Sequence, residues 1–390
     1  MDNFSFYTPT RYKFGRGVEN MVGEMARNEG WRTVLIIYGG GSAIRSGLLE
    51  KVCTSLSQAG VSFVTFGGIK PNPTDGPVRE AIGMCRRCNP DGIIAVGGGS
   101  VIDTAKAVAA GFYHDGDFWD FFAGKAPVEK ALPIGVVLTI PAAGSEGSGN
   151  AVITNTETGQ KISIRTEFVL RPVFSLLDPE LTYTLPAAQT AAGIADMMAH
   201  IMERYFTTTE GVEVTDRLAE GLLMAIMDQA KVVMAEPENY DARANIMWSG
   251  TLAHNGICGC GRREDWGSHG LEHVLSAEYG VTHGAGLAVV FPAWMTFMAS
   301  HKPAKVAQLG QRVFGIPADL SPEKGALETA TKFRGFFKSL GLPTTLGELG
   351  IEGADFGYLT RCFLRDKGNP FKGYMTLGPE EVEAIYRLMV

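Results

Sequence analysis

The chain has 390 residues, 45% of them hydrophobic, and its 35 basic and 42 acidic side chains give a formal net charge of -7. This length exceeds the size at which a single hydrophobic core stops growing, so we expect two domains. The acidic balance, with no basic stripe to neutralise phosphates, argues against nucleic acid or an anionic membrane surface as the main partner.

The first part of the chain, residues 1–183, is predicted to form an α/β domain. Continuous apolar, β-branched runs separated by helical patterns indicate a parallel sheet covered on both faces. The expected strands are Thr33–Tyr38, Val61–Phe66, Gly92–Val96, Ile134–Ile140 and Val173–Leu177, and the expected helices are Ala43–Ala59, Gly76–Cys88 and Val101–Ala110. Two further runs, Ala151–Thr154 and Lys161–Ile164, flank a turn-rich segment and predict a hairpin beside the sheet.

Residues 184–390 are predicted to form an all-helical domain. From Pro186 onward, alanine, leucine and methionine recur at helical spacing with almost no strand-like run. The dipeptides Asp178-Pro179 and Leu185-Pro186 mark the boundary between the two domains, because proline interrupts regular structure. The longest apolar stretch, Gly286–Ala299, is too short to span a bilayer and contains Pro292.

The N-terminal sequence MDNFSFYTPTRYKF lacks the apolar core of a signal peptide, and the six cysteines are scattered. We therefore expect a cytoplasmic enzyme. Cys85-x-x-Cys88 and Cys258-x-Cys260 each lack a matching second half, so neither is expected to be a metal or redox motif.

Two glycine clusters of the α/β part suggest a nucleotide site. Gly97-Gly98-Gly99-Ser100 follows a strand and opens a helix, which places bare N–H groups where a pyrophosphate could sit. The alternative is a structural turn with Ser100 and Asp103 as helix cap and partner. Gly39-Gly40-Gly41-Ser42 follows the first strand, and no acidic residue stands there to bind the ribose hydroxyls of the coenzyme. Arg45 lies one helical turn later. Because an acidic residue at this position would repel the 2′-phosphate, its absence favours NADP(H) over NAD(H). A plain glycine turn without coenzyme bias is the alternative.

Five of the seven histidines lie between residues 200 and 283. Residues four apart share one helix face, so Asp196 with His200, and His269 with His273, can each aim two donors at one point. His283 follows at a glycine-rich turn. One carboxylate with neutral imidazoles suits zinc, iron(II), cobalt or nickel. The spacing predicts a divalent metal site but does not decide which histidines bind the ion.

Four motifs occur in order along the chain: Pro71-Asn72-Pro73, Gly97-Gly98-Gly99-Ser100-x-x-Asp103-x-x-Lys106, Thr139-Ile140-Pro141-Ala142-Ala143-Gly144-Ser145-Glu146, and the set Asp196, His200, His269 and His283. Together they resemble the iron-containing (group III) alcohol dehydrogenases, from about Tyr12 to Arg387. The sub-pattern Tyr38-Gly-Gly-Gly-Ser42, with Asp265-Trp266 and Asn369-Pro370-Phe371, looks most like the butanol dehydrogenase branch.

The resemblance implies a dinucleotide-binding α/β domain, a helical metal domain and a function in aldehyde reduction. By motif position one divalent ion, Fe²⁺ or Zn²⁺, is expected on Asp196, His200, His269 and His283, while His273 faces nicotinamide and substrate. The residues expected to contact NADP(H) are Gly39, Gly40, Ser42, Asn72, Gly98, Gly99, Ser100, Asp103, Thr139, Ser145 and Lys161. Where many relatives have a threonine-rich turn, this chain has Ile140-Pro141-Ala142-Ala143.

We therefore expect hydride transfer between NADP(H) and a primary alcohol or aldehyde such as butanol or butyraldehyde, with metal polarisation of the carbonyl. His273 is the expected proton relay, against the alternative of a packing histidine; His254 is expected to pack nearby without a role. The competing functions are a dehydroquinate synthase-like or glycerol dehydrogenase-like enzyme using NAD, and a catalytically silent binding protein on the same scaffold. The family suggests a homodimer or larger homo-oligomer.

Overall fold

The computed structural model describes all 390 residues and divides into two compact units. One unit is formed by Tyr7–Leu185. The other is formed by Pro186–Val390 together with the first six residues, Met1–Phe6. Met1 and Asp2 are bound there, since the terminal amine donates to Glu210 O at 2.5 Å and Asp2 N donates to Gly261 O at 2.8 Å. No helix is long and apolar enough to cross a membrane.

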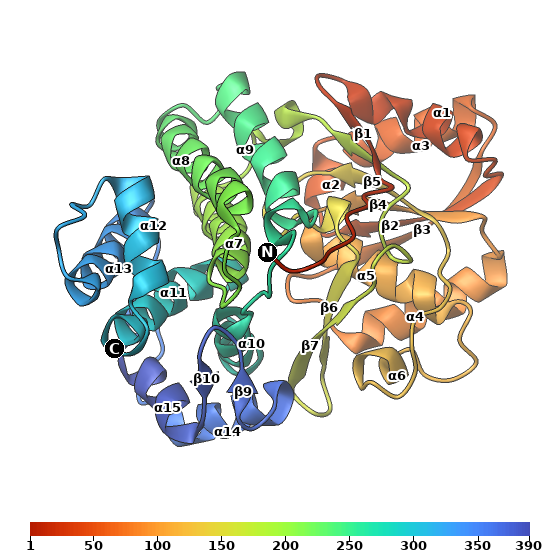
Figure 1. Cartoon of the computed structure of the whole chain (residues 1–390). Helices are drawn as coiled ribbons and strands as arrows, with labels where there is room; N and C mark the ends of the chain where they lie inside the picture. Colours follow the sequence, from red (N-terminus) through yellow and green to blue (C-terminus); the bar gives the residue numbers. More distant parts are fainter. The chain divides into compact units, whose positions relative to one another are not determined.

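The unit Tyr7–Leu185 is built on a parallel sheet of order β1-β8-β5-β4-β2-β3 (Figure 1). Every pairing in this sheet is parallel, as the buried β-branched runs predict. The strands are β1 (Arg11–Phe14), β2 (Thr33–Gly39), β3 (Ser62–Ile69), β4 (Gly92–Gly97), β5 (Ile134–Leu138) and β8 (Phe174–Leu177).

Helices cover both faces of this sheet (Figure 1). On one face α1 (Val22–Asn28) and α3 (Leu48–Gln58) bury apolar side chains against alternate residues of β2 and β4, such as Val34 and Val96. On the other face lie α4 (Asp75–Cys88) and α5 (Gly99–Gly111). The remaining elements are α2 (Ser42–Arg45), α6 (Trp119–Phe122) and the antiparallel hairpin β6 (Asn150–Asn155) and β7 (Gln160–Arg165).

One expectation for this unit was wrong, and one strand was not predicted. The single helix predicted over Ala43–Ala59 is two helices, α2 and α3, because Gly47 takes a left-handed conformation (φ 74°) between them. The edge strand β1 was not expected, since its sequence RYKF is short and only partly apolar. The hairpin and the other five strands are confirmed, with ends shifted by at most three residues.

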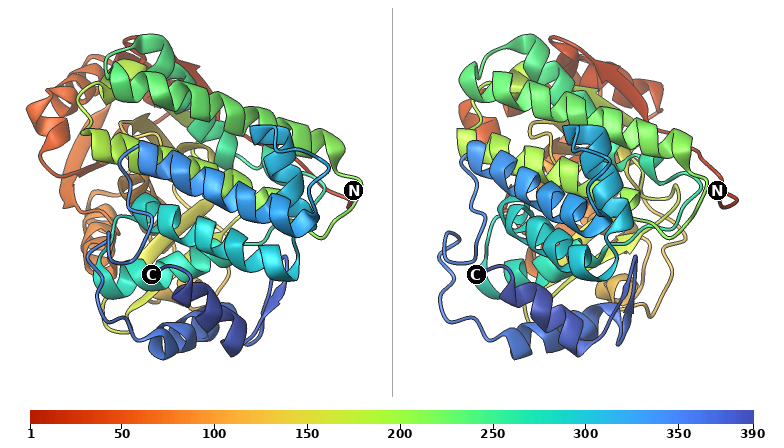
Figure 2. Two further views of the ribbon diagram at one scale, coloured as in Figure 1. Left: turned by 90° about the vertical axis from the view of Figure 1, so that its left-hand side faces the viewer. Right: turned by 60° about the vertical axis from the view of Figure 1, so that its left-hand side comes forward.

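The unit formed by Pro186–Val390 with Met1–Phe6 is helical, as expected. Its apolar core lies among the helices, and α7, α11 and α13 lie side by side (Figure 2). The helices are α7 (Ala187–Tyr205), α8 (Glu213–Ala235), α9 (Tyr240–His254), α10 (Gly267–Tyr279), α11 (His283–His301), α12 (Ala304–Phe314), α13 (Pro322–Ser339), α14 (Phe356–Lys367) and α15 (Pro379–Arg387), with a small pair β9 (Phe371–Lys372) and β10 (Thr376–Leu377).

Candidate metal centre and coenzyme site

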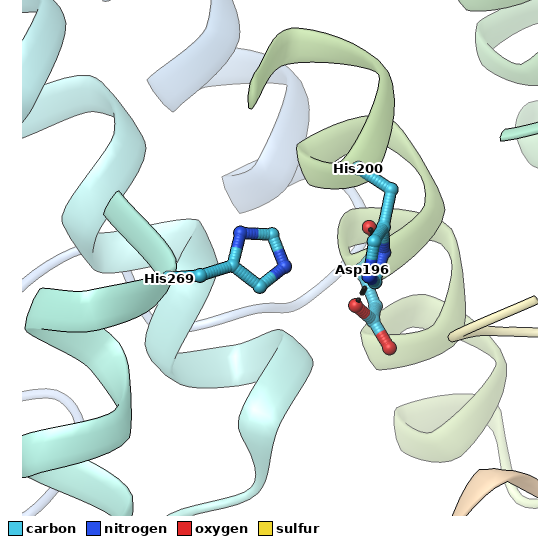
Figure 3. Close-up of side chains that lie close together, drawn as sticks. All are labelled: Asp196, His200 and His269. Atoms are coloured by element: carbon cyan, nitrogen blue, oxygen red, sulfur yellow. Dashed lines mark hydrogen bonds and ion pairs between the residues drawn. The ribbon is translucent and has the colours of Figure 1, made fainter. Parts of the chain in front are cut away.

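Three of the predicted metal ligands meet inside the helical unit. Asp196 and His200 lie one turn apart on α7, and His269 approaches from α10 (Figure 3). All three are buried, and one ligand atom from each lies within 4.8 Å of the others. The i, i+4 spacing on α7 therefore aims two donors at one point, as helix geometry requires.

His283, the first residue of α11, adjoins the same cluster. Its Nε2 atom is 3.7 Å from Asp196 Oδ1, and its ring centre is 5.4 Å from that of His269. His273 lies beside these groups, with its ring centre 5.5 Å from His283 and 6.3 Å from His269. All five residues of the predicted site thus gather in one region.

The chemistry of this cluster fits a divalent metal ion. Burial, together with the nearby His200 and His283, lowers the pKa of His269 well below its usual value, so its ring is neutral and able to ligate. The Nε2 atom of His269 is buried without a hydrogen-bond partner. A buried polar atom without a partner lowers the stability of the folded protein unless a ligand or ion interacts with it. Neutral imidazoles with one carboxylate are the donors that Zn²⁺ and Fe²⁺ accept.

Three residues near this cluster were not assigned a role from the sequence. Glu203 on α7 contacts His269, and Glu272 on α10 contacts His283. Each glutamate lies three residues after a histidine of its own helix, but its contact is with a histidine of another helix, so this spacing identifies neither contact. The ring of His254, at the end of α9, lies edge-on to His200 with centres 4.2 Å apart. The only sequence feature that could have indicated this contact is that His254 is one of the five histidines between residues 200 and 283.

Trp266 forms one wall of the cluster. Its ring centre lies 5.1 Å from His269 and 5.9 Å from both His200 and His254. The indole N–H donates to Glu264 at 2.6 Å, and the guanidinium of Arg204 lies 4.8 Å from the ring centre. The indole ring therefore packs against the histidines on that side of the cluster.

The predicted coenzyme residues gather at the carboxyl ends of neighbouring strands. Gly39 ends β2 and Gly40 follows it, Gly98 and Gly99 follow β4, and Thr139 follows β5. In this sheet β3 lies on one side of β2 and β4 lies on the other side. The strand order therefore reverses direction between β2 and β4, which makes this the topological switch point of the sheet. Ligands of open α/β sheets bind at such a point.

The turn after β4 is closely packed against the loop after β5. A Cβ atom on Gly98 would lie 2.9 Å from Cβ of Ile140, so this position needs glycine. The capping alternative for Ser100 was wrong, because α5 starts at Gly99 with Gly98 as its cap. Asp103 instead accepts hydrogen bonds from Ser145 Oγ at 2.6 Å and Val152 N at 3.0 Å.

The remaining predicted coenzyme residues lie in the same unit. Lys161 on β7 donates to Asn72 Oδ1 at 3.1 Å, and Asn72 adopts a left-handed conformation (φ 52°). Ser42 is the first residue of α2, and the guanidinium of Arg45 folds over Gly41, where a side chain would collide with it. A positive charge therefore lies beside the glycine turn that ends β2.

Burial raises the thiol pKa values of both cysteine pairs. All six cysteines are free. Burial raises the pKa of Cys85 to about 12 and that of Cys258 to about 11. A thiol that stays protonated is a poor nucleophile and a poor metal ligand.

Comparison with known families matches both halves of the chain. Residues 9–179 match the model of the iron-containing alcohol dehydrogenases, and residues 190–390 match the C-terminal model of the same family. The two matches together span nearly the whole sequence.

Individual relatives agree. The chain is 38% identical to NADH-dependent butanol dehydrogenase A of Clostridium acetobutylicum, with 99% of each chain covered. It is 40% identical to the NADPH-dependent aldehyde reductase YqhD of Escherichia coli, covering 93% of this chain and 92% of that protein. The crystal structure of NADH-dependent butanol dehydrogenase A of Thermotoga maritima superposes with a TM-score of 0.96 at 40% identity, covering 100% and 99% of the two chains.

Proposed function

The chain belongs to the iron-containing alcohol dehydrogenase family, in its butanol dehydrogenase-like branch, and from this we propose a metal-dependent reductase of small aldehydes that uses NADP(H). The family makes it an enzyme of the alcohol dehydrogenase and aldehyde reductase class. The observation that carries the proposal is the buried convergence of Asp196, His200 and His269 with His283 beside them.

In this proposal the helical unit holds one divalent ion, Fe²⁺ or Zn²⁺, on Asp196, His200, His269 and His283. The α/β unit holds the coenzyme at the glycine turns that end β2 and β4. A bound ion supplies Lewis acidity toward the oxygen of an aldehyde or alcohol, and the nicotinamide supplies or accepts the hydride. The protein contributes orientation: backbone N–H groups at the start of α5 bind pyrophosphate, and Trp266 limits access of water to the ligands.

We assign proton transfer to His273. A carbonyl that becomes an alcohol takes up one proton, and an imidazole is suited to deliver it near neutral pH. His273 is 7% exposed and lies beside His283 and His269 without being needed as a ligand. His273→Ala should lower kcat by about 100-fold or more and change the pH profile. His301→Ala, remote in the same unit, is the control; an unchanged rate and profile in His273→Ala would remove the assignment.

We also propose a preference for NADPH. No acidic residue ends β2, and Arg45 lies over Gly41 beside the adenosine position expected from the fold. The relatives divide, since the two butanol dehydrogenases are named NADH-dependent and the aldehyde reductase is named NADPH-dependent. Arg45→Ala should lower kcat/KM for NADPH and leave that for NADH unchanged. A marked preference of the native enzyme for NADH would overturn this part of the proposal.

The decisive assay follows NADPH absorbance with butyraldehyde and a short aldehyde panel. Steady coenzyme consumption that stops on chelation and returns with Fe²⁺ or Zn²⁺ supports the reductase. An absence of net consumption with every carbonyl substrate would instead indicate a lyase that uses its nucleotide transiently. Metal analysis of the purified protein identifies the ion.

Oligomeric state and compartment complete the proposal. We infer a homodimer or larger homo-oligomer in the cytoplasm, because the family suggests the former and six free cysteines suit a reducing compartment. Light scattering of the purified protein tests the oligomer, and a monomer at assay concentration would contradict it.

A further inference from the structure

Two buried glutamates contact the histidines of the metal centre through the ring nitrogen that faces away from the cluster. Glu203 Oε1 lies 2.8 Å from His269 Nδ1, and Glu272 Oε2 contacts His283 Nδ1. The side chains of both glutamates are at most 1% exposed. An ionised carboxylate can only accept, so with both glutamates ionised each contact makes Nδ1 the donor and leaves the Nε2 lone pair free.

The Nε2 atom of each ring is the one that would hold the proposed ion. His269 Nε2 has no hydrogen-bond partner, and His283 Nε2 is 3.7 Å from Asp196 Oδ1. The two glutamates therefore select the tautomer that ligation through Nε2 requires.

Glu203 also fixes the position of His269 along its helix. It accepts from His269 N at 2.7 Å in addition to the ring, and from Trp266 N at 2.7 Å. One carboxylate of α7 thus binds the backbone and the ring of the same histidine at the start of α10. Since Asp196 and His200 lie on α7, this residue ties ligands from two helices into one geometry.

Glu272 is held in a comparable way beside α11. Its Oε1 atom accepts from Ser276 Oγ, a hydroxyl that also lies 3.2 Å from Val281 O in the turn before His283. Gly286 makes room for it, because a Cβ atom there would lie 2.8 Å from Glu272 Cγ. The side chain is therefore confined between α10 and α11 with one oxygen directed at His283.

We propose that Glu203 and Glu272 are positioning residues of the metal centre, which fix the Nδ1–H tautomer of His269 and His283 and strengthen both rings as ligands. The inference rests on the proposed function, since it concerns the ion assigned there. Carboxylates in this role elsewhere raise metal affinity by about 10- to 100-fold.

The test compares three glutamine variants of the full-length, metal-loaded protein. Glu203→Gln and Glu272→Gln keep the shape of the side chain but remove its charge. Glu220→Gln is the matched control, because Glu220 is also buried in the helical unit but bonds Tyr205, Arg217 and Arg312 and contacts no histidine. Zn²⁺ affinity is measured by competition with a chelator, and ligand geometry by the visible absorption spectrum of the Co²⁺-substituted protein.

We expect both site variants to weaken Zn²⁺ binding by about 10- to 100-fold and to alter the Co²⁺ spectrum, while the control changes neither. Wild-type affinity and spectrum in both site variants would overturn the inference and leave the proposed function intact. A native protein that binds no metal, or reduces aldehydes equally well without it, would instead defeat the proposed function. If one site variant fails to fold, the other decides the question.

Discussion

Lys106 is fully buried in the α/β unit, where its ammonium group holds the loop that contains Ser145. Its three N–H groups are shared among four oxygen atoms: Ser145 O and Oγ, each at 2.7 Å, Ser148 O at 2.9 Å and Asn150 O at 2.7 Å. Burial lowers the pKa of Lys106 to about 8, against the opposing effect of Asp103 and Glu146, so the side chain remains mostly charged at neutral pH.

Lys106→Met should destabilise this unit and weaken coenzyme binding. The substitution leaves several buried carbonyl groups without a donor, which should lower the free energy of unfolding by about 3 kcal/mol or more. Urea unfolding and a fluorescence titration with NADPH measure the two effects. The exposed Lys125→Met is the control, with an expected change of about 0.5 kcal/mol or less. Equal stability of the two variants would contradict the argument.

For individual residues, motif spacing predicted which side chains cluster at the metal centre. It did not predict the contacts that orient these side chains. Asp196 and His200 could be paired because one helical turn separates them. Glu203 was missed because a glutamate on a helix is usually solvated, and its partner His269 is 66 residues away.

Among the elements, α7 and α11 pack closely against each other near the metal centre. Gly284 follows His283 on α11, and a Cβ atom there would collide with the backbone carbonyl of Ala192 on α7. The two helices can approach this closely only without a side chain at this position.

Gly284→Ala should therefore separate α7 from α11. We expect a loss of about 2 kcal/mol in the free energy of unfolding and weaker metal binding, since Asp196 and His283 lie on the two displaced helices. Gly221→Ala on α8 is the control, because its added methyl group meets no atom within 4 Å and should stabilise that helix slightly. Thermal unfolding measures the change in stability, and metal titration measures the change in metal affinity. A metal affinity in Gly284→Ala equal to that of the native protein would refute the expected displacement.

A second element contact links α4 to the hairpin. Asp75, the first residue of α4, accepts from Thr156 N at 3.0 Å and Oγ1 at 2.9 Å and pairs with Arg79. Burial alone would raise the pKa of Asp75, but the hydrogen bonds from Arg79 and Thr156 outweigh it and lower the pKa below the usual 3.8.

Because the folded pKa lies below the unfolded value, the stabilisation by Asp75 is complete above the unfolded pKa and is lost as pH falls through the folded pKa. Asp75→Asn should lower the free energy of unfolding by about 1–2 kcal/mol near pH 7. Urea unfolding should show the same difference near pH 5 and a smaller one near pH 3. A difference independent of pH would mean that the charge of Asp75 is not its source.

The element boundaries show where local pattern is insufficient. The run Thr33–Tyr38 predicted β2 because continuous apolar, β-branched residues favour a buried strand. The break between α2 and α3 was not predicted, since a glycine within a helical pattern does not reveal that its φ is positive.

For the whole molecule, the proposed metal and coenzyme residues belong to different units. Asp196, His200, His269 and His283 all lie in the helical unit, whereas the predicted NADP(H) contacts lie in Tyr7–Leu185. Each ligand should therefore stabilise its own unit.

Metal removal should increase amide hydrogen exchange in α7, α10 and α11, and NADPH should slow it at the ends of β2 and β4. At a free ligand concentration of about 1,000 times Kd, the stabilisation is about 4 kcal/mol for each ligand. Hydrogen exchange followed by mass spectrometry resolves the two responses. Equal protection of both units by the metal alone would contradict this division.

The sequence by itself determined the two-part architecture, the parallel sheet, the helical second half and the family, because strand and helix periodicity and ordered motifs are local properties of the chain. It also brought Asp196 with His200 and His269 with His273 to common helix faces. Only the tertiary structure decided that Glu203 binds His269, that Glu272 binds His283 and that His254 adjoins His200. These contacts join residues on different helices, and their geometry depends on how the helices pack, which no short sequence pattern encodes.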